Sequence, residues 1–244
     1  MPSWRKLPRA EISVIIPTRN EEQALPGTFH NLLGQEGNFE VILVDGGSSD
    51  GTYEIAERWR EVFRGSGRRL VVRVSEPGRA VQMNLGAEEA EGDVFLFLHA
   101  DTQLPSSAQK NIRSALEEPR CVGGRFDISL DGEEWIYRLI GKLISLRSRM
   151  TRVATGDQAI FVRRKIFEDI GGFPDIPLME DIAFSRVLKS KGSVACLKNK
   201  VVTSARRWKN EGIWRTILKM WALRLSFLAG ISPLRLKRFY DDSR

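Results

Sequence analysis

The chain has 244 residues and a formal net charge of +7, and its 42% hydrophobic and 28% charged content is ordinary for a soluble globular protein. No uninterrupted run of about 18 apolar residues occurs, and the basic stretch Met1–Ala10 lacks the apolar core of a signal peptide, so we expect a cytoplasmic protein without a transmembrane helix. The cysteines, Cys121 and Cys196, have no metal-type spacing, and the basic excess permits an anionic substrate, a nucleic acid or an acidic membrane surface.

The first half of the chain alternates short apolar runs with segments of helical periodicity. Runs rich in β-branched residues predict strands, and apolar residues three and four positions apart predict helices. The predicted strands are 12–17, 39–45, 70–75 and 94–98, and the predicted helices are 21–35, 52–63, 79–90 and 105–116. Strands that alternate with helices in this way favour a parallel sheet with right-handed crossovers.

The second half is less regular. Its predicted strands are 122–130, 159–162 and 194–197, and its predicted helices are 133–148, 181–191 and 213–228. No linker rich in Pro, Gly or Ser divides the chain, so we expect one domain, residues 1–244, whose two halves meet near residue 105.

The predicted strand 94–98 leads directly into His99 and Asp101. Ligands bind outside the carboxyl ends of parallel strands, and side chains two positions apart on an extended chain point the same way. One imidazole and one carboxylate together suit a divalent cation. A solvated polar pair at a strand end is the alternative, and this run alone does not decide between the two.

A glycine-rich turn follows the second predicted strand at Asp45–Thr52. Its glycines would let the backbone approach a ligand, and Asp45 would accept hydrogen bonds from a ribose or a base edge, although a tight turn before a helix explains the same residues. The chain has no GxxxxGK[ST] loop, no GxGxxG after a strand and no Gly-x-Ser-x-Gly elbow, which argues against P-loop NTPases, dinucleotide-binding enzymes and serine hydrolases.

Several motifs together resemble one enzyme family. Ser13–Glu22 (SVIIPTRNEE), Val44–Thr52 (VDGGSSDGT), Leu98–Thr102 (LHADT) and the pair Glu180-Asp181 resemble family 2 glycosyltransferases of the GT-A fold. Gly78–Ala87, His99-Ala100-Asp101 and Gly156–Gln158 resemble more narrowly the arsenosugar-biosynthesis glycosyltransferase subgroup. The resemblance covers nearly the whole chain. It implies an α/β, Rossmann-like single domain with a mostly parallel sheet flanked by helices. In that domain, residues from about 11 to 104 bind the nucleotide sugar, and residues from about 105 to 244 bind the acceptor.

The resemblance implies a role for each matched residue. Asp101 matches the last acid of the metal-binding D-x-D motif, with His99 in the place of the first acid, so these two would hold Mg²⁺ or Mn²⁺ on the donor diphosphate. Asp181, flanked by Glu180, matches the catalytic base of inverting members, although both acids would also suit a helix N-terminus. The residues expected to contact the donor are Pro17, Thr18, Arg19, Glu21, Asp45, Arg79, Ala100, Arg207 and Trp208.

The expected reaction is transfer of a sugar from a nucleotide donor, UDP- or GDP-linked above others, to a small-molecule, lipid or glycan acceptor. Nucleic acid is not expected as a partner. Ser204–Trp208 resembles the Q-x-x-R-W motif of processive relatives with Ser204 in the Gln position, which weakens a claim of polymer synthesis. Asp157 and Gln158 would grip acceptor hydroxyls. The rival functions are nucleotidyl transfer, disfavoured because Pro17–Glu22 has no glycine, and a non-catalytic basic module that binds membrane or nucleic acid.

The C-terminal segment 213–244 interleaves apolar and basic residues. A basic amphipathic helix that contains Trp can lie in a membrane interface, which would make the protein peripheral on the inner face of the membrane. The alternative is a helix that packs its apolar side on the sheet and exposes a basic face, and we favour this second interpretation.

Overall fold

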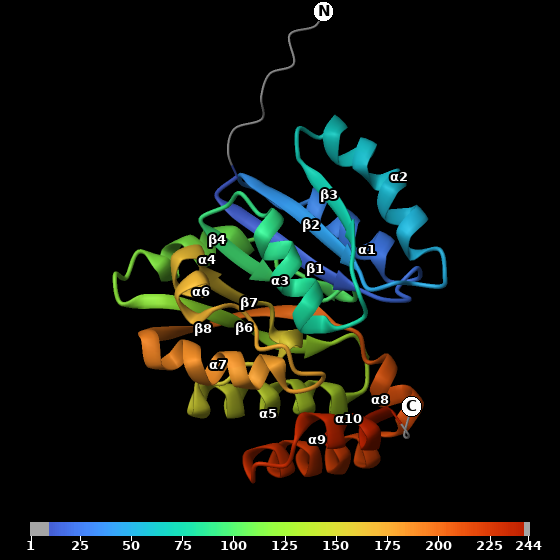
Figure 1. Ribbon diagram of the computed structural model, residues 1–244, viewed down its shortest axis with the longest axis vertical. Coiled ribbons are helices and arrows are strands. Elements are labelled where there is room, and N and C mark those ends of the chain that lie inside the picture. The colour runs from blue at the N-terminus through green and yellow to red at the C-terminus, as the bar shows by residue number, and fades with distance from the viewer. Residues whose placement is uncertain (1–9, 242–244) are drawn as a thin grey trace, which may run out of the picture.

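The computed structural model describes residues 10–241, so most of Met1–Ala10 and the last residues of the segment 213–244 lie outside the described part. One mixed sheet of eight strands forms its centre, in the order β3-β2-β1-β4-β7-β6-β8-β5 (Figure 1). The strands are β1 (Ile12–Thr18), β2 (Phe39–Asp45), β3 (Leu70–Val74), β4 (Val94–Phe97), β5 (Thr102–Gln103), β6 (Cys121–Leu130), β7 (Ile160–Arg163) and β8 (Ser193–Thr203).

The helices follow the predicted pattern closely. They are α1 (Leu25–Leu33), α2 (Thr52–Gly65), α3 (Arg79–Glu89), α4 (Ala108–Leu116), α5 (Trp135–Thr151), α6 (Arg164–Ile170), α7 (Glu180–Lys191), α8 (Arg206–Glu211), α9 (Ile213–Leu228) and α10 (Pro233–Asp241), with a short 3₁₀ helix at Gly156–Gln158. All predicted strands and helices are present. The short elements β5, α6, α8 and α10 were not predicted, and β8 is longer than expected.

The predicted parallel sheet is confirmed for β1 to β4. Beyond β4 the sheet changes direction, because β7 pairs antiparallel with β4 and with β6. The register places Phe97, the last residue of β4, opposite Ile160, the first residue of β7. The segment that precedes β7 therefore lies beside the carboxyl end of β4, where the sequence predicts the site.

Apolar residues cover both faces of the sheet. All seven residues of β1 and all seven of β2 are buried, as the near-continuous apolar runs require. On one face Phe29 of α1 and Phe63 of α2 pack edge to face, and on the other Phe167 of α6 and Phe184 of α7 pack together. Figure 1 shows α3, α6 and α7 in front of the sheet. This packing fixes the strand ends that carry the candidate site.

Helix α5 packs on β6, and α9 and α10 lie below it at the bottom of Figure 1; these three helices are called the lower layer. The expectation that the C-terminal helix packs its apolar side on the sheet is wrong. The principal neighbours of α9 are α8 and α10, and five of its large apolar side chains are exposed: Trp214, Leu218, Trp221, Leu225 and Leu228. Within residues 10–241, no helix has both the length and the apolar content needed to cross a membrane.

Candidate active site

The chain turns sharply where β4 ends. Thr102 N–H donates a hydrogen bond to the His99 carbonyl at 3.1 Å, so residues 99–102 form a turn rather than a continuation of the strand. The expectation of an extended chain at His99 and Asp101 is therefore wrong, and strand alternation does not align their side chains. The turn is instead fixed from outside, because Thr28 Oγ1 donates to the Ala100 carbonyl at 2.6 Å.

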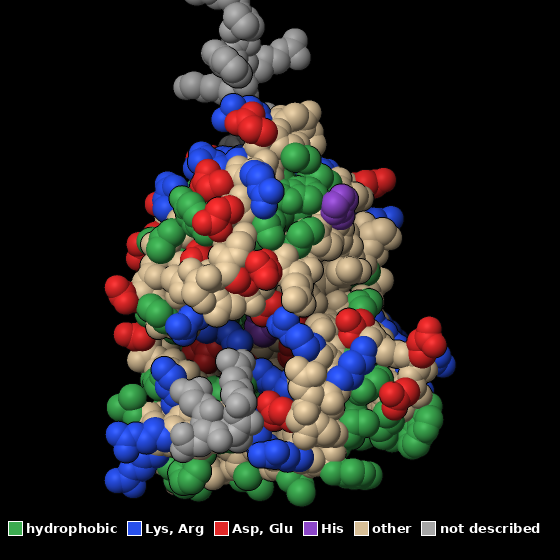
Figure 2. Space-filling model, turned by 90° about the vertical axis from the view of Figure 1, so that its right-hand side faces the viewer, with side chains coloured by type: hydrophobic (Ala, Val, Ile, Leu, Met, Phe, Trp, Pro, Cys, Tyr) green, Lys and Arg blue, Asp and Glu red, His purple; other side chains and the backbone are tan. Residues whose placement is uncertain are grey.

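A pocket lies at this end of the sheet, between the two halves of the chain. It joins residues from β1, α3, β4 and the start of α7, which are far apart in the sequence. Its lining residues are Pro17, Arg79, Met83, Phe97, Leu98, His99, Gly156, Ile160, Phe173, Glu180 and Asp181. Figure 2 shows a hollow with acidic and basic side chains on its walls. The structure thus brings together Pro17, Arg79, His99 and the acidic pair, as the sequence predicts.

Asp181 is held in position by backbone groups. Its Oδ2 accepts a hydrogen bond from Gly156 N–H at 2.8 Å, and its Oδ1 accepts one from Ile182 N–H at 2.7 Å. Burial, followed by the charge of Glu180, raises the pKa of Asp181 to about 6, against the lowering effect of Gly156 N–H and Arg79. Helix α7 begins after Met179, and both acids lie in its first turn, so the alternative that they suit a helix N-terminus holds beside the proposed catalytic role.

Arg79 begins α3 and faces the acidic pair. Its Nη1 lies 3.5 Å from Glu180 Oε1, and Glu180 is itself buried. Burial lowers the pKa of Arg79, but the charges of Glu180, Asp181, Tyr240 and Asp101 outweigh it and raise that pKa above its ordinary value. Arg79 is therefore a fixed positive charge beside the candidate base.

The two candidate metal ligands have different environments. Burial raises the pKa of Asp101, and the positive charge of Arg206 partly offsets this rise. Burial and the nearby charges of Arg79 and Arg207 hold the pKa of His99 well below its usual range, so its ring is neutral. His99 Nε2 is buried and has no hydrogen-bond partner within the described residues. A neutral, unpartnered imidazole nitrogen has the lone pair that a metal ligand needs.

The protein supplies few ligands for a cation at this place. Across residues 10–241, no three His, Cys, Asp or Glu side chains gather in a group able to hold a metal ion. A cation bound by Asp101 and His99 would need its remaining ligands from phosphate oxygens and water, the usual arrangement for Mg²⁺ with a phosphate substrate. The pocket lining includes His99 but not Asp101, so joint binding of a cation by these two residues stays a prediction, and such a cation would arrive with an anionic substrate.

The predicted nucleoside side lies where β1 and β2 end. Asp45 is buried and accepts hydrogen bonds from the backbone N–H of Ser48 at 2.9 Å and from the Ser48 hydroxyl. Gln82 donates to the Thr18 carbonyl at 2.6 Å and to the Val44 carbonyl at 2.8 Å. Asp45 thus shapes the glycine-rich turn, while Arg19 is exposed beside it. Contact of either residue with a nucleoside stays a prediction.

Helix α8 connects the C-terminal half to the nucleoside side. Arg206 Nη2 donates to both carboxylate oxygens of Glu21 at 2.9 Å, a pair that the sequence does not reveal because the partners are 185 positions apart. Arg207 lies over the Tyr240 ring at 5.4 Å from its centroid. Trp208 is half-buried and packs against the cluster that contains Leu130 and Tyr137.

The predicted acceptor residues divide into one that is accessible and one that is not. Gln158 is fully buried, where its Nε2 donates to the Phe126 carbonyl at 3.3 Å. The expectation that Gln158 grips an acceptor hydroxyl is therefore wrong. Asp157 Oδ1 accepts from the Thr155 hydroxyl at 2.5 Å and is only half-buried. Two half-buried arginines near this loop, Arg147 and Arg224, were not predicted.

Comparison with known sequences identifies one family. The family model described as Glycosyl transferase family 2 matches residues 13–171. A dolichol-phosphate mannosyltransferase of Pyrococcus furiosus is 32% identical over 168 residues, which cover 67% of this chain and 45% of that protein. A PGL/p-HBAD biosynthesis glycosyltransferase of Mycobacterium bovis is 33% identical over 167 residues, 66% of this chain and 62% of that protein. The chain thus matches about half of the length of these curated relatives.

Comparison with solved structures identifies the fold. A mannosyltransferase of Pyrobaculum calidifontis in complex with GDP-Man and Mn²⁺ superposes with a TM-score of 0.67 at 20% identity, over 89% of this chain and 61% of that one. Residues 1–349 of Staphylococcus aureus TarS in complex with UDP superpose with a TM-score of 0.65 at 21% identity, over 80% and 60%. At these sequence identities, the structural similarity shows a shared fold and no more.

Proposed function

The chain belongs to glycosyl transferase family 2 and has the GT-A fold, and from this premise we propose that it is a metal-dependent, inverting glycosyltransferase. It transfers a sugar from a nucleoside-diphosphate donor to a hydroxyl group of an acceptor. The observation that carries the proposal is the pocket in which a fixed carboxylate, Asp181, faces Arg79 and the neutral His99. Family membership also decides against the rival nucleotidyltransferase.

Asp181 is the proposed general base. The acceptor oxygen forms a bond to the anomeric carbon while the bond from that carbon to the diphosphate breaks, and the leaving diphosphate keeps the electron pair. The hydroxyl proton passes to Asp181, whose two backbone hydrogen bonds fix its orientation. A single displacement inverts the anomeric configuration. Arg79 and Glu180 tune the charge on Asp181 from opposite directions.

The donor occupies the carboxyl ends of β1, β2 and β4 in this proposal. Asp101 and His99 hold a divalent cation, Mg²⁺ or Mn²⁺, which when bound offsets charge on the diphosphate. Asp45 and Arg19 contact the nucleoside, and Arg79 and Arg207 supply positive charge near the diphosphate. We expect the donor to be a uridine or guanosine diphosphate sugar that binds together with a divalent cation. A cytoplasmic location would supply the nucleotide sugar and the cation.

Replacement of two carboxylates tests this assignment. We expect Asp181→Asn to lower the rate of sugar transfer about 10²- to 10⁴-fold while donor binding remains, because Asn keeps the shape of the side chain but cannot accept the proton. Asp101→Ala should instead weaken metal-dependent donor binding. Asp175→Asn is the matched control, since Asp175 is exposed on the loop before α7. Wild-type rates of donor hydrolysis and transfer in both test variants would refute the assignment.

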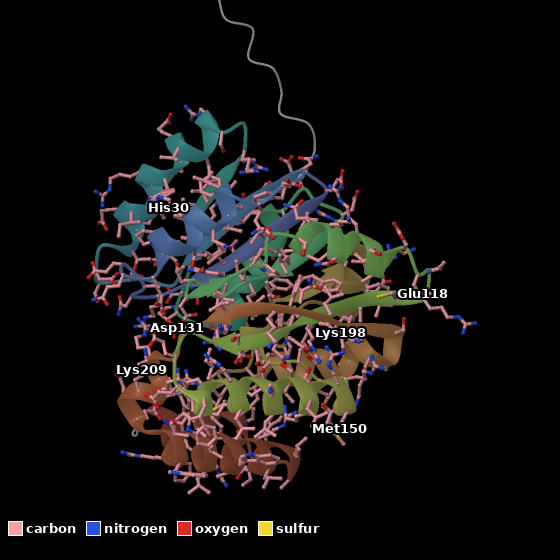
Figure 3. The ribbon with its side chains drawn as sticks, turned by 180° about the vertical axis from the view of Figure 1, so that it is seen from behind. His30, Glu118, Asp131, Met150, Lys198 and Lys209 are labelled. Carbon is pink, nitrogen blue, oxygen red and sulfur yellow. The ribbon has the colours of Figure 1, made fainter. Side chains whose placement is uncertain are left out.

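We further propose that the layer of α5, α9 and α10 rests on an anionic membrane surface. Exposed apolar side chains form one stripe along α5 and another along α9. In this proposal the two stripes together form the apolar face, which consists of Trp135, Leu139, Leu143, Leu146 and Met150 on α5 and of Trp214, Leu218, Trp221, Leu225 and Leu228 on α9. Figure 3 shows Met150 at the outer edge of this layer. Five positions spaced at three or four residues make each stripe continuous.

The positive charge of these helices indicates that the apolar face binds an anionic surface. The helices α5, α9 and α10 contain ten Lys and Arg residues and a single acid, Asp241, so the rest of the chain carries a slight negative charge. Exposed basic residues such as Lys142 and Arg215 flank the apolar stripes. Tryptophan and leucine between basic residues fit the headgroup region of anionic lipid.

Co-sedimentation with vesicles tests this contact. We expect the protein to bind vesicles that contain phosphatidylglycerol more strongly than vesicles of phosphatidylcholine alone, with loss of binding at high salt. Trp221→Glu should abolish binding, whereas Val74→Glu, at an exposed apolar residue of β3, should not. Equal binding by both variants would contradict the proposal, as would a dimer that forms through the same face.

A further inference from the structure

Two arginines, one on α5 and one on α9, each have a buried guanidinium nitrogen without a hydrogen-bond partner in the described part of the chain. Arg147, on α5, donates from Nη2 to the Thr155 hydroxyl at 3.4 Å, but its Nε is buried and has no hydrogen-bond partner. Arg224, on α9, likewise has a buried Nη1 with no partner. Among the described residues, neither guanidinium forms an ion pair, although both are half-buried.

The charge of Arg224 acts on Arg147, and the charge of Asp181 acts on both arginines. After burial, the charge of Arg224 is the largest cause that lowers the pKa of Arg147, to about 10. The charge of Asp181 acts in the opposite direction on both arginines. Thr155, the hydrogen-bond partner of Arg147, also directly precedes Gly156, whose N–H holds Asp181. Arg147 therefore borders the loop that holds the base, and Arg224 is linked to it through its charge.

Other arginines of this region form ion pairs with acids, although the Nε of Arg125 is also buried without a hydrogen-bond partner among the described residues. Arg125 is fully buried and pairs with Asp127, and Arg149 Nη2 lies 2.6 Å from the other oxygen of Asp127. Asp181 and Asp157 are engaged by backbone and hydroxyl donors, and no ion pair joins either of them to Arg147 or Arg224 in the described part of the chain. Two cations with buried, unpartnered N–H groups are costly unless an anion joins them.

We propose that Arg147 and Arg224 bind an anionic group, a phosphate or a carboxylate, that the acceptor carries next to its reactive hydroxyl. The inference rests on the proposed function, since it names the acceptor class of that same site. Two guanidinium forks match the oxygen geometry of a phosphate or carboxylate. The site differs from the expected diphosphate contacts, because Arg79 belongs to α3 and these arginines belong to α5 and α9.

Titration with inorganic phosphate tests the site without knowledge of the acceptor. The protein is first saturated with a nucleoside diphosphate and Mn²⁺, so that the donor site is filled, and phosphate binding is then measured by calorimetry. We expect wild-type protein to bind phosphate more tightly than chloride, and Arg147→Gln and Arg224→Gln each to weaken binding about tenfold or more. The control, Arg186→Gln on α7, removes an exposed charge and should bind phosphate as the wild type does.

Phosphate that binds no better than chloride would overturn the inference, as would equal binding in both arginine variants. Failure of the nucleotide to bind would count against the proposed function instead, and the phosphate titration would then be done without it. Thermal unfolding verifies that each variant is folded.

Matched acceptor pairs then identify the source of the anion. Ribose 5-phosphate against ribose, and glucuronate against glucose, test soluble acceptors. Vesicles with phosphatidylglycerol against vesicles with diacylglycerol test a lipid phosphate. We expect the charged member of at least one pair to be used at about tenfold higher kcat/KM, and this preference to collapse in Arg147→Gln and Arg224→Gln. Equal use of charged and neutral members in every pair would overturn the inference.

Discussion

Asp181 combines a fixed position with an environment that favours its protonated form. Its pKa of about 6 means that the carboxyl is protonated below that pH and cannot take a proton from the acceptor. We therefore expect kcat/KM for transfer to rise with pH through about 6 and then to level. Glu180→Gln should move this acid limb to lower pH by removal of a negative charge, and Arg79→Gln should move it to higher pH by removal of a positive one.

The readout is the position of the acid limb in a pH profile, not its height, because both variants also lower the maximal rate. A limb that stays at the same pH in both variants would mean that another group titrates.

Gly156 provides a second test at the scale of the residue. A Cβ atom at this position would lie 2.6 Å from His99 Nε2, and the Gly156 N–H holds Asp181. We expect Gly156→Ala to displace the imidazole or the loop, and so to lower kcat by at least about tenfold with little loss of stability, since a small misplacement of catalytic groups is costly. Gly171→Ala is not a suitable control because its φ is +84°, whereas Gly65→Ala, where no atom lies within 4 Å, is suitable.

Individual residues were predictable from sequence where a motif marks them. Asp181, Arg79 and His99 lie together as the motifs indicate. The buried role of Gln158 and the partnership of Arg206 with Glu21 were not predictable, because each depends on contacts between segments remote in sequence. Arg147 was hidden for another reason: a basic residue in an amphipathic helix is ordinarily exposed, and no local pattern indicates that it points inward.

Helix α3, which carries the pocket residues Arg79 and Met83, packs closely on β1. Its Gly86 packs so tightly on β1 that an added Cβ would lie 2.4 Å from Ile15 Cγ2. We expect Gly86→Ala to lower the free energy of unfolding by about 1–3 kcal/mol, since the core must shift to accept the methyl group. Gly65→Ala, at the open end of α2, should leave it equal or slightly raised. Denaturant unfolding of both variants measures the difference, and equal stability would contradict this view of the α3 packing.

Elements were predictable where burial shapes their pattern. Strands β1 and β2 are buried along their whole length, so their apolar runs are unambiguous. Helix α9 was correctly predicted as a helix but wrongly oriented. Its periodic apolar residues indicate a face that avoids water, and the sequence does not say whether protein or another surface covers that face.

At the scale of the whole molecule, the fold separates three tasks. The parallel part of the sheet presents the donor side, β7 and α7 bring the loop and the base to it, and the basic helical layer lies below (Figure 1). Alternation of strands and helices predicted the first part. The change from parallel to antiparallel pairing between β4 and β7 was not predictable, because pairing between strands that are distant in sequence leaves no local sequence pattern.

The central claim is that this chain binds a nucleoside diphosphate through a divalent cation at Asp101 and His99. Calorimetric titration with UDP, GDP, CDP and dTDP, each with and without Mn²⁺, tests it most directly. We expect at least one nucleotide to bind about tenfold or more tightly with Mn²⁺, and Asp101→Ala to remove this gain. Binding of no nucleotide, or binding that is indifferent to Mn²⁺ and to Asp101→Ala, would contradict it.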